Sequence, residues 1–141
     1  GGYPLDQNAY QCPKGMSAAE ATVNDGGVII MLATCQDGHG GESYYHSIAD
    51  AESADAFFQQ CLHTPQVETL PDQWCAQIWC RIVRKYKVLF VADKAQEQLI
   101  RDLKVEYFET LDEAYARARE LKGPDATLTC IPNGVSVVVK D

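Results

Sequence analysis

The feature of this sequence that most constrains its fold is an alternation between short apolar runs and helical segments. Apolar runs without polar alternation are typical of strands that are covered on both faces. Helical segments of roughly 10 to 15 residues separate these runs, which argues for strands that lie parallel. The expected strands are VIIMLATC (28–35), KVLFVAD (87–93), EYFE (106–109) and the two halves of ATLTCIPNGVSVVVKD (126–141), on either side of a Pro-Asn-Gly turn. We therefore expect an α/β fold, a single domain with a mostly parallel sheet layered by helices.

Capping signals and apolar spacing predict where the helices lie. Ser17 and Glu20 match a capping box, which predicts a short first helix from Ala18 that NDGG ends. Thr110 and Glu113 form a second capping box. The further helical segments are expected at 43–63 with breaks, at 72–86 with both tryptophans on its packing face, at 94–105, and at 110–123 with a glycine at its end.

Length and charge exclude several classes of partner. The chain has 141 residues, which is enough for one domain with its own core. Its net charge of -8 repels nucleic acid phosphate and anionic lipid. The longest apolar run is far shorter than the ~20 residues that span a bilayer. Neither nucleic acid nor a membrane is expected as a partner.

The six cysteines show no C-x-x-C pair, so no metal site is predicted from them. An even number allows three disulfides, but a chain of this length and apolar content needs none, and no secretory h-region opens it. We expect reduced thiols and a cytoplasmic location. The chain begins with Gly1 rather than methionine, and we expect it to be a fragment of a longer protein.

The stretch YQCPKG places one lysine, Lys14, between proline and glycine. Proline disfavours a helical residue before it, and glycine tolerates unusual backbone angles, so CPKG is expected as a tight connector. Lys14 would then project from a loop beside Tyr10 and Gln11 at the end of a helical turn. An ammonium, an amide and a phenol suit a small carboxylate. The alternative is that Lys14 and Gln11 are ordinary solvated side chains.

Two further stretches are candidates for a site. DGHGGE (37–42) follows the first expected strand, where open α/β sheets bind ligands, and its N–H groups suit a phosphate. It matches neither a dinucleotide fingerprint nor a P-loop. His39 is either a proton carrier or metal ligand or, as is commoner for a single loop histidine, structural. Trp74 begins a helix, where it faces either the core or a ligand.

The opening run GGYPLDQNAYQCPKGMSAAEATVNDGGVIIMLATCQDGHGGE resembles the start of the C-terminal domain of nickel-pincer-dependent lactate racemases and related 2-hydroxyacid racemases and epimerases. The similarity is strong over about residues 1–46, and the later α/β pattern fits the rest of that domain. In that family a tyrosine, a glutamine and, three residues later, a lysine lie beside the bound 2-hydroxy acid. The match YQCPK implies that Tyr10, Gln11 and Lys14 bind the substrate, and Trp74 corresponds to a tryptophan of the same pocket.

The resemblance also implies what this chain lacks. Enzymes of the family have two domains, and the N-terminal one binds the nickel-pincer nucleotide through a lysine and supplies the histidines for acid and base chemistry. Residues 1–141 would be the C-terminal, lid domain, with no catalytic residue, metal ligand or cofactor of its own. Its partners would be lactate or another small 2-hydroxy acid and its own N-terminal domain, and the isolated fragment would be inactive.

The implied reaction passes the C2 hydride of the substrate to the pincer ring while a histidine takes the hydroxyl proton, so that C2 becomes planar and is then inverted. Lys14 and Gln11 would hold the carboxylate, Tyr10 would add a hydrogen bond, and Trp74 would exclude water. Two other readings remain open: a non-catalytic α/β module that binds a small anion or phosphate, and an interaction domain that docks through an exposed apolar patch.

Overall fold

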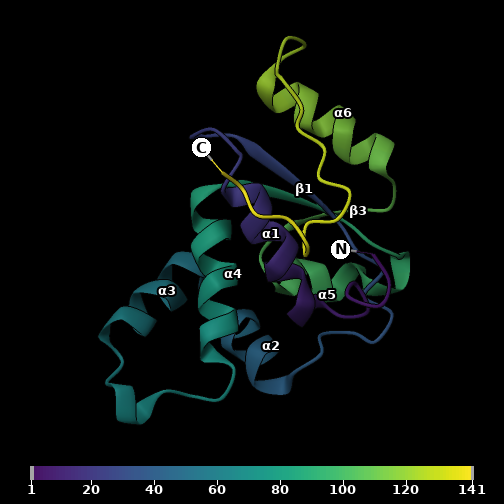
Figure 1. The fold of residues 1–141 in the computed structure, drawn as a ribbon. Helices are drawn as coiled ribbons and strands as arrows, with labels where there is room; N and C mark the ends of the chain where they lie inside the picture. Colours follow the sequence, from purple (N-terminus) through teal and green to yellow (C-terminus); the bar gives the residue numbers. More distant parts are fainter. Residues whose placement is uncertain (1, 141) are drawn as a thin grey trace.

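The computed structural model describes residues 2–140, and its architecture is a single α/β domain, which confirms the expected fold class (Figure 1). A three-stranded parallel sheet has the order β1-β2-β3, so β2 lies in the centre. In the register, Val28 lies opposite Lys87, and Leu89 lies opposite Glu106. The strands are β1 (Val28–Leu32), β2 (Lys87–Val91) and β3 (Glu106–Phe108).

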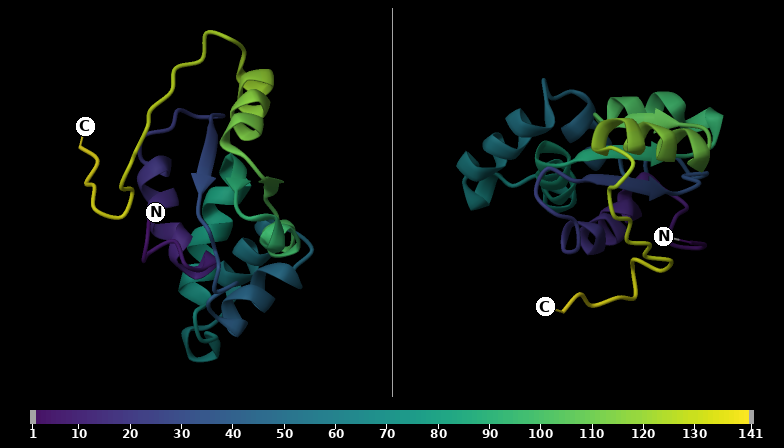
Figure 2. Two further views of the ribbon diagram at one scale, coloured as in Figure 1. Left: turned by 90° about the vertical axis from the view of Figure 1, so that its right-hand side faces the viewer. Right: turned by 90° about the horizontal axis from the view of Figure 1, so that it is seen from above.

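Helices cover both faces of the sheet. Figure 2 shows α1 (Cys12–Glu20) and α6 (Leu111–Lys122) on opposite sides of it. Helix α6 contacts all three strands, whereas α1 contacts β1, and α4 (Gln73–Lys85) contacts β2 and α1. The remaining helices are α2 (Glu42–Ala49), α3 (Ala54–His63) and α5 (Glu97–Asp102), with short 3-10 turns at Ala9–Gln11, Gln66–Glu68 and Lys94–Gln96.

The core lies where α1 and α4 meet the sheet and where α2 packs on α4. Trp79 of α4 is fully buried, and its indole Nε1 donates to the Leu103 carbonyl at 2.8 Å. Tyr44 of α2 packs edge-on against it, with ring centroids 6.3 Å apart. The other large, fully buried side chains are Phe90, Met16, Ile48, Ile82, Leu89, Ile100 and Leu103.

The first helix begins earlier than its capping signal predicts, and this corrects the expected connector at CPKG. Helix α1 starts at Cys12, so Lys14 lies in its first turn and Ser17 in its interior. Cys12 has helical angles (φ -61°, ψ -33°) although a proline follows it. Cys12 and Pro13 are both buried, and a proline in the first turn sacrifices no helical hydrogen bond. Core packing therefore outweighs the local preference of the residue before proline.

The C-terminal segment also differs from the expectation. Residues 124–140 form no strand, and their one backbone–backbone hydrogen bond within residues 2–140 runs from Ser136 N–H to the Asn133 carbonyl. Figure 1 shows this segment crossing α1 rather than lying along the sheet. A Cβ added to Gly134 would lie 3.0 Å from the Cα of Gly15, so the two glycines allow a close approach of the segment to the helix. The strand pattern was misleading because, among residues 2–140, this segment pairs with neither edge strand of the sheet.

The capping box predicted at Thr110 and Glu113 is confirmed. The Thr110 hydroxyl accepts from Glu113 N–H at 3.3 Å, and the Glu113 carboxylate accepts from Thr110 N–H at 3.1 Å. All six cysteines are free thiols. In the part of the chain that the structure describes, no helix combines the length and the apolar character needed to cross a membrane.

Candidate functional site

The site begins at the 3-10 turn that carries Tyr10. The N–H groups of Ala9 and Tyr10 donate to the carbonyls of Gly38 and His39, each at 3.1 Å. The thiol of Cys75 donates to the Tyr10 carbonyl at 3.4 Å. The backbone of Tyr10 is thus fixed by the glycine-rich loop on one side and by α4 on the other.

Lys14 and Gln11 lie together at the start of α1. The Lys14 ammonium donates to Gln11 Oε1 at 2.5 Å, an i, i+3 contact on the helix surface. Within residues 2–140 this is the one hydrogen bond that the ammonium makes, so two of its three N–H donors remain for a ligand. The bond also turns the Gln11 amide so that its oxygen faces the lysine and its NH₂ group is left as a donor. Together they offer directed donors and one positive charge.

A small hollow of about 100 Å³ lies beside this pair, between α1 and α4. Tyr10, Lys14 and Trp74 all line it, whereas Gln11 contacts Lys14 from outside the lining. The Trp74 ring meets the Tyr10 ring edge-on, with centroids 6.2 Å apart at 85°. The remaining lining residues are Pro13, Ser17, Cys75 and Ile78. Three of the four predicted site residues therefore lie around one hollow, and the fourth adjoins it.

The two tryptophans of α4 do not share one face, contrary to the prediction that the helix packs through both. Trp79 is buried in the core, but Trp74 is 57% exposed. Trp74 therefore lies at the hollow instead of in the core.

Asp72 is the site residue that sequence reasoning missed. The Tyr10 hydroxyl donates to Asp72 Oδ1 at 3.0 Å, across 62 positions of the chain. Burial and this hydrogen bond raise the pKa of Tyr10 to about 12, so the phenol stays protonated at neutral pH. The sequence signal was an acidic residue at the start of a predicted helix, which suggests a cap; its contact with Tyr10 depends on the tertiary fold.

The thiol at the hollow is not a nucleophile at neutral pH. Burial raises the pKa of Cys75 to about 12; the charge of Asp72 adds to this effect and that of Lys14 opposes it. A thiol with so high a pKa is almost entirely protonated, and thiolates are the reactive form. The hollow therefore supplies binding groups rather than a reactive sulfur.

The DGHGGE loop has a structural role in this fold. Its Asp37, Gly38 and Gly41 N–H groups already donate, to the Gln7 carbonyl, the Cys35 carbonyl and His39 Nδ1 respectively. Its carbonyls, at Gly38 and His39, hold the Tyr10 turn. The loop therefore presents carbonyl oxygens to the site, which suits its support of Tyr10 better than the binding of a phosphate.

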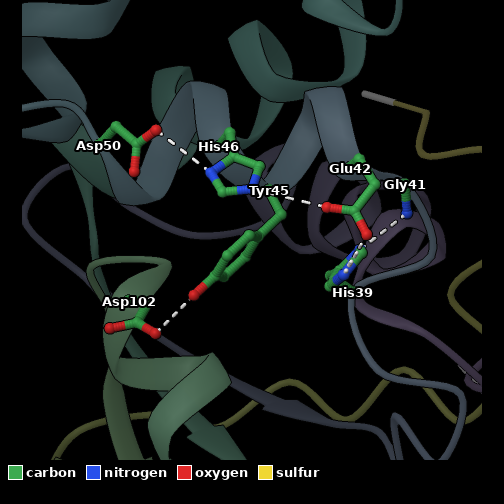
Figure 3. A network of polar contacts seen from close by, with 7 residues as sticks. All are labelled: His39, Gly41, Glu42, Tyr45, His46, Asp50 and Asp102. Atoms are coloured by element: carbon green, nitrogen blue, oxygen red, sulfur yellow. Dashed lines mark hydrogen bonds and ion pairs between the residues drawn. The ribbon is translucent and has the colours of Figure 1, made fainter.

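The histidines near this loop form a surface network (Figure 3). His39 Nε2 lies 3.6 Å from Glu42, and its ring stacks on Tyr45 with centroids 5.0 Å apart. His46 contacts Glu42 at 3.5 Å and Asp50 at 3.2 Å. Among residues 2–140 no three His, Cys, Asp or Glu side chains are grouped as metal ligands. The structural reading of His39 is the one that these contacts favour.

Comparison with known proteins identifies close relatives. Residues 1–139 match the family model described as the lactate racemase C-terminal domain. The chain is 50% identical over 140 residues to a lactate racemase of Lactiplantibacillus plantarum, covering 99% of this chain and 33% of that protein. It is 43% identical over 141 residues to a lactate racemase of Thermoanaerobacterium thermosaccharolyticum, covering 100% of this chain and 33% of that protein.

The fold agrees with a solved structure from the same family. The structure of the lactate racemase apoprotein from Thermoanaerobacterium thermosaccharolyticum matches with a TM-score of 0.95 and 43% identity, over 99% of this chain and 34% of that one. The chain therefore spans about a third of the length of the relatives that it matches.

Proposed function

This chain belongs to the family of lactate racemase C-terminal domains, and from that membership we propose that it is the substrate-holding half of a lactate or related 2-hydroxyacid racemase. The observation that carries the proposal is the hollow that Tyr10, Lys14 and Trp74 line together. The relatives are about three times as long, so we propose that a second, N-terminal domain closes this hollow into a cleft. A cytoplasmic location is part of the same proposal.

Lys14 and Gln11 are the groups that hold the substrate carboxylate. The ammonium supplies charge, and the free N–H donors of both side chains supply direction. Racemisation requires C2 to become planar and then to accept hydrogen on the opposite face. A carboxylate held at one point keeps C2 in place through that change, which is a contribution of orientation. Trp74 covers the substrate from the α4 side and excludes water.

The nickel-pincer nucleotide of this family supplies the hydride acceptor when it is bound. The residues of this domain do not fit it: no group of three metal-ligating side chains occurs within residues 2–140, and the thiol at the hollow is protonated. We propose that the cofactor is held by the part of the racemase outside this chain. The residues described here act on the substrate alone, and the chain by itself is expected to be inactive.

The test uses the full-length protein that contains this domain, loaded with the nickel cofactor and supplied with L-lactate, while the appearance of D-lactate is followed. A charge-assisted hydrogen bond contributes about 1.5–3 kcal/mol, so Lys14→Ala should raise KM about 10- to 100-fold and lower kcat less. Lys122→Ala is the matched control, because Lys122 lies in the last turn of α6 on the opposite side of the sheet. Unchanged kinetics for Lys14→Ala would contradict the site.

The alternative function is a non-catalytic module that binds a small anion. Experiments on the same full-length protein distinguish it from a racemase. A nickel-loaded wild type that turns over neither lactate nor another 2-hydroxy acid, and that binds inorganic phosphate in calorimetry, would favour the module. Turnover that depends on nickel would exclude it.

A further inference from the structure

We propose that Asp72 is a positioning residue for this hollow: its carboxylate accepts the hydrogen bond that the Tyr10 hydroxyl donates, fixes the ring beside Lys14, and leaves the phenol oxygen as a hydrogen-bond acceptor only. The inference rests on the proposed function and deepens it, because it assigns the donors that hold the substrate.

The backbone of Asp72 is the first observation. Asp72 has φ +61° and ψ 1°, a left-handed conformation that aspartate adopts only occasionally and glycine adopts freely. If the turn alone were required, glycine would meet the requirement without strain. A residue that is kept in such a conformation is often held there for the sake of its side chain.

The second observation is that Asp72 does not cap its own helix. It is the N-cap residue of α4, where an aspartate ordinarily accepts from the first N–H groups of the helix, yet its side chain makes no capping hydrogen bond. Its carboxylate instead accepts from the Tyr10 hydroxyl at 3.0 Å. The carboxylate is therefore directed at Tyr10, a lining residue of the hollow, and not at the N–H groups of the helix end.

The third observation is that neighbouring contacts hold the pair in place. Ser43 Oγ donates to the Pro71 carbonyl at 2.6 Å, which ties the turn before Asp72 to helix α2. A Cβ added to Gly41 would lie 3.6 Å from both Asp72 Oδ2 and Tyr10 Cδ2, so the backbone at Gly41 packs directly against the pair. The orientation of Tyr10 is thus set before any ligand binds.

The consequence concerns which groups bind a carboxylate. A phenol has one O–H group to donate, and that group donates its hydrogen bond to Asp72. The phenol oxygen is left with lone pairs, which can accept a hydrogen bond but cannot donate one to an anion in the hollow that Tyr10 lines. The carboxylate is then held by Lys14 and Gln11, and the fixed ring of Tyr10 forms a wall of the same hollow. This narrows the three donors expected from the sequence to two.

The experiment measures KM, kcat and the melting temperature of full-length nickel-loaded variants with L-lactate. Asp72→Gly removes the carboxylate at a position where glycine is unstrained, so KM should rise about 5- to 10-fold, as expected for one lost hydrogen bond, while the melting temperature is kept. Asp72→Asn retains an acceptor and tolerates the same backbone, so KM should stay within about twofold of the wild type. In the Tyr10→Phe background, Asp72→Gly should add less than about twofold, because it acts through Tyr10.

Asp102 provides the matched control. It accepts from the Tyr45 hydroxyl at 2.7 Å, the same kind of tyrosine–aspartate pair, in the network of Figure 3. Asp102→Ala should lower the melting temperature and leave KM unchanged. Unchanged KM for Asp72→Gly, multiplicative effects of Asp72→Gly and Tyr10→Phe, or an equal rise in KM for Asp102→Ala would each overturn the proposal.

Failure of the proposed function would be seen separately, as absence of turnover by the wild type. In that event the role of Asp72 is decided by ¹³C NMR of protein labelled at the tyrosine phenol carbon. The Tyr10 resonance is identified by its loss in Tyr10→Phe. It should move in Asp72→Gly and stay in place in Asp102→Ala; a resonance unmoved in Asp72→Gly would contradict the hydrogen bond itself.

Discussion

At the scale of single residues, the two tryptophans of α4 show how one helix serves both core and site. Positions i and i+5 of an α-helix are about 140° apart around its axis. Trp79 therefore packs against Tyr44 and Phe90 in the core while Trp74 faces Tyr10 at the surface hollow. The same type of side chain thus lies in two different environments, and substitutions of the two residues are expected to have different effects.

Trp79→Ala should lower the free energy of unfolding by about 3–5 kcal/mol, because it opens a cavity in the core and leaves the Leu103 carbonyl without its donor. Trp74→Ala should lower it by less than about 1 kcal/mol, since this ring is half exposed. Urea denaturation measures both. In the full-length enzyme Trp74→Ala should nevertheless raise KM about tenfold; a large loss of stability without a change in KM would place Trp74 in the core instead.

At the scale of elements, the N-terminal ends of α1 and α6 show when a capping signal in the sequence decides where a helix begins. The capping box of α6 lies in an exposed turn, where no competing packing acts on Thr110 and Glu113. The capping box expected at Ser17 competes with the burial of Cys12 and Pro13, and burial determines where the helix starts. A local capping signal therefore sets the first residue of a helix only when tertiary packing does not favour another start.

Thr110→Ala should destabilise the protein by about 1 kcal/mol, since it removes the acceptor for the Glu113 N–H at the start of α6. Glu113→Gln should cost only a few tenths of a kcal/mol, because glutamine also completes a capping box. Thermal and urea unfolding of the two variants provide the comparison. Equal losses would show that the charge of Glu113, and not the box, stabilises the helix.

The contact between α6 and the sheet predicts that the stability of the fold depends on pH. Glu106 of β3 lies 2.7 Å from the Lys87 ammonium of β2 and 3.2 Å from Arg117 of α6, and the hydrogen bond from Lys87 lowers the pKa of Glu106 below its ordinary value of 4.5. A carboxylate whose pKa is lower in the folded than in the unfolded state stabilises the fold at pH values above its unfolded-state pKa. This stabilisation is lost as the pH falls through the folded-state pKa.

Glu106→Gln should therefore lower stability at pH 7 by up to about 1 kcal/mol, the usual size for a partly exposed ion pair. The difference from the wild type should shrink as the pH falls below 4.5. Urea unfolding from pH 7 to below pH 4.5 measures this difference in stability. Glu120→Gln is the control, because Glu120 is exposed and also contacts Arg117. A difference that persists at low pH would mean that packing, not charge, is lost.

At the scale of the whole molecule, the hollow is open to solvent and is formed by groups from the first and fourth helices and the 3-10 turn before them. Its volume of about 100 Å³ is well below the roughly 300–1,000 Å³ of enclosed ligand pockets. An ammonium and an amide in water gain little net free energy from a carboxylate. The domain is therefore expected to depend on the rest of its chain for affinity.

The isolated 141-residue chain should bind L-lactate only weakly, with a Kd above about 10 mM, because half of the proposed cleft is absent. Chemical-shift changes during a lactate titration measure this, and any changes should be reduced in Lys14→Ala. Micromolar binding by the isolated chain would contradict the view that the hollow is half of a site.

The sequence by itself determined the α/β class, the three strands at β1, β2 and β3, the capped α6, and, through its resemblance to a family, the group around Tyr10, Lys14 and Trp74. These features depend on periodicity, on exposed caps and on short motifs, which act locally. Tertiary structure alone decided where α1 begins, that residues 124–140 form no strand, that Trp74 and Trp79 have opposite environments, and that Asp72 holds Tyr10. Each of these depends on which distant segments pack together, because burial energies and contacts across the chain exceed the local preferences that a sequence displays.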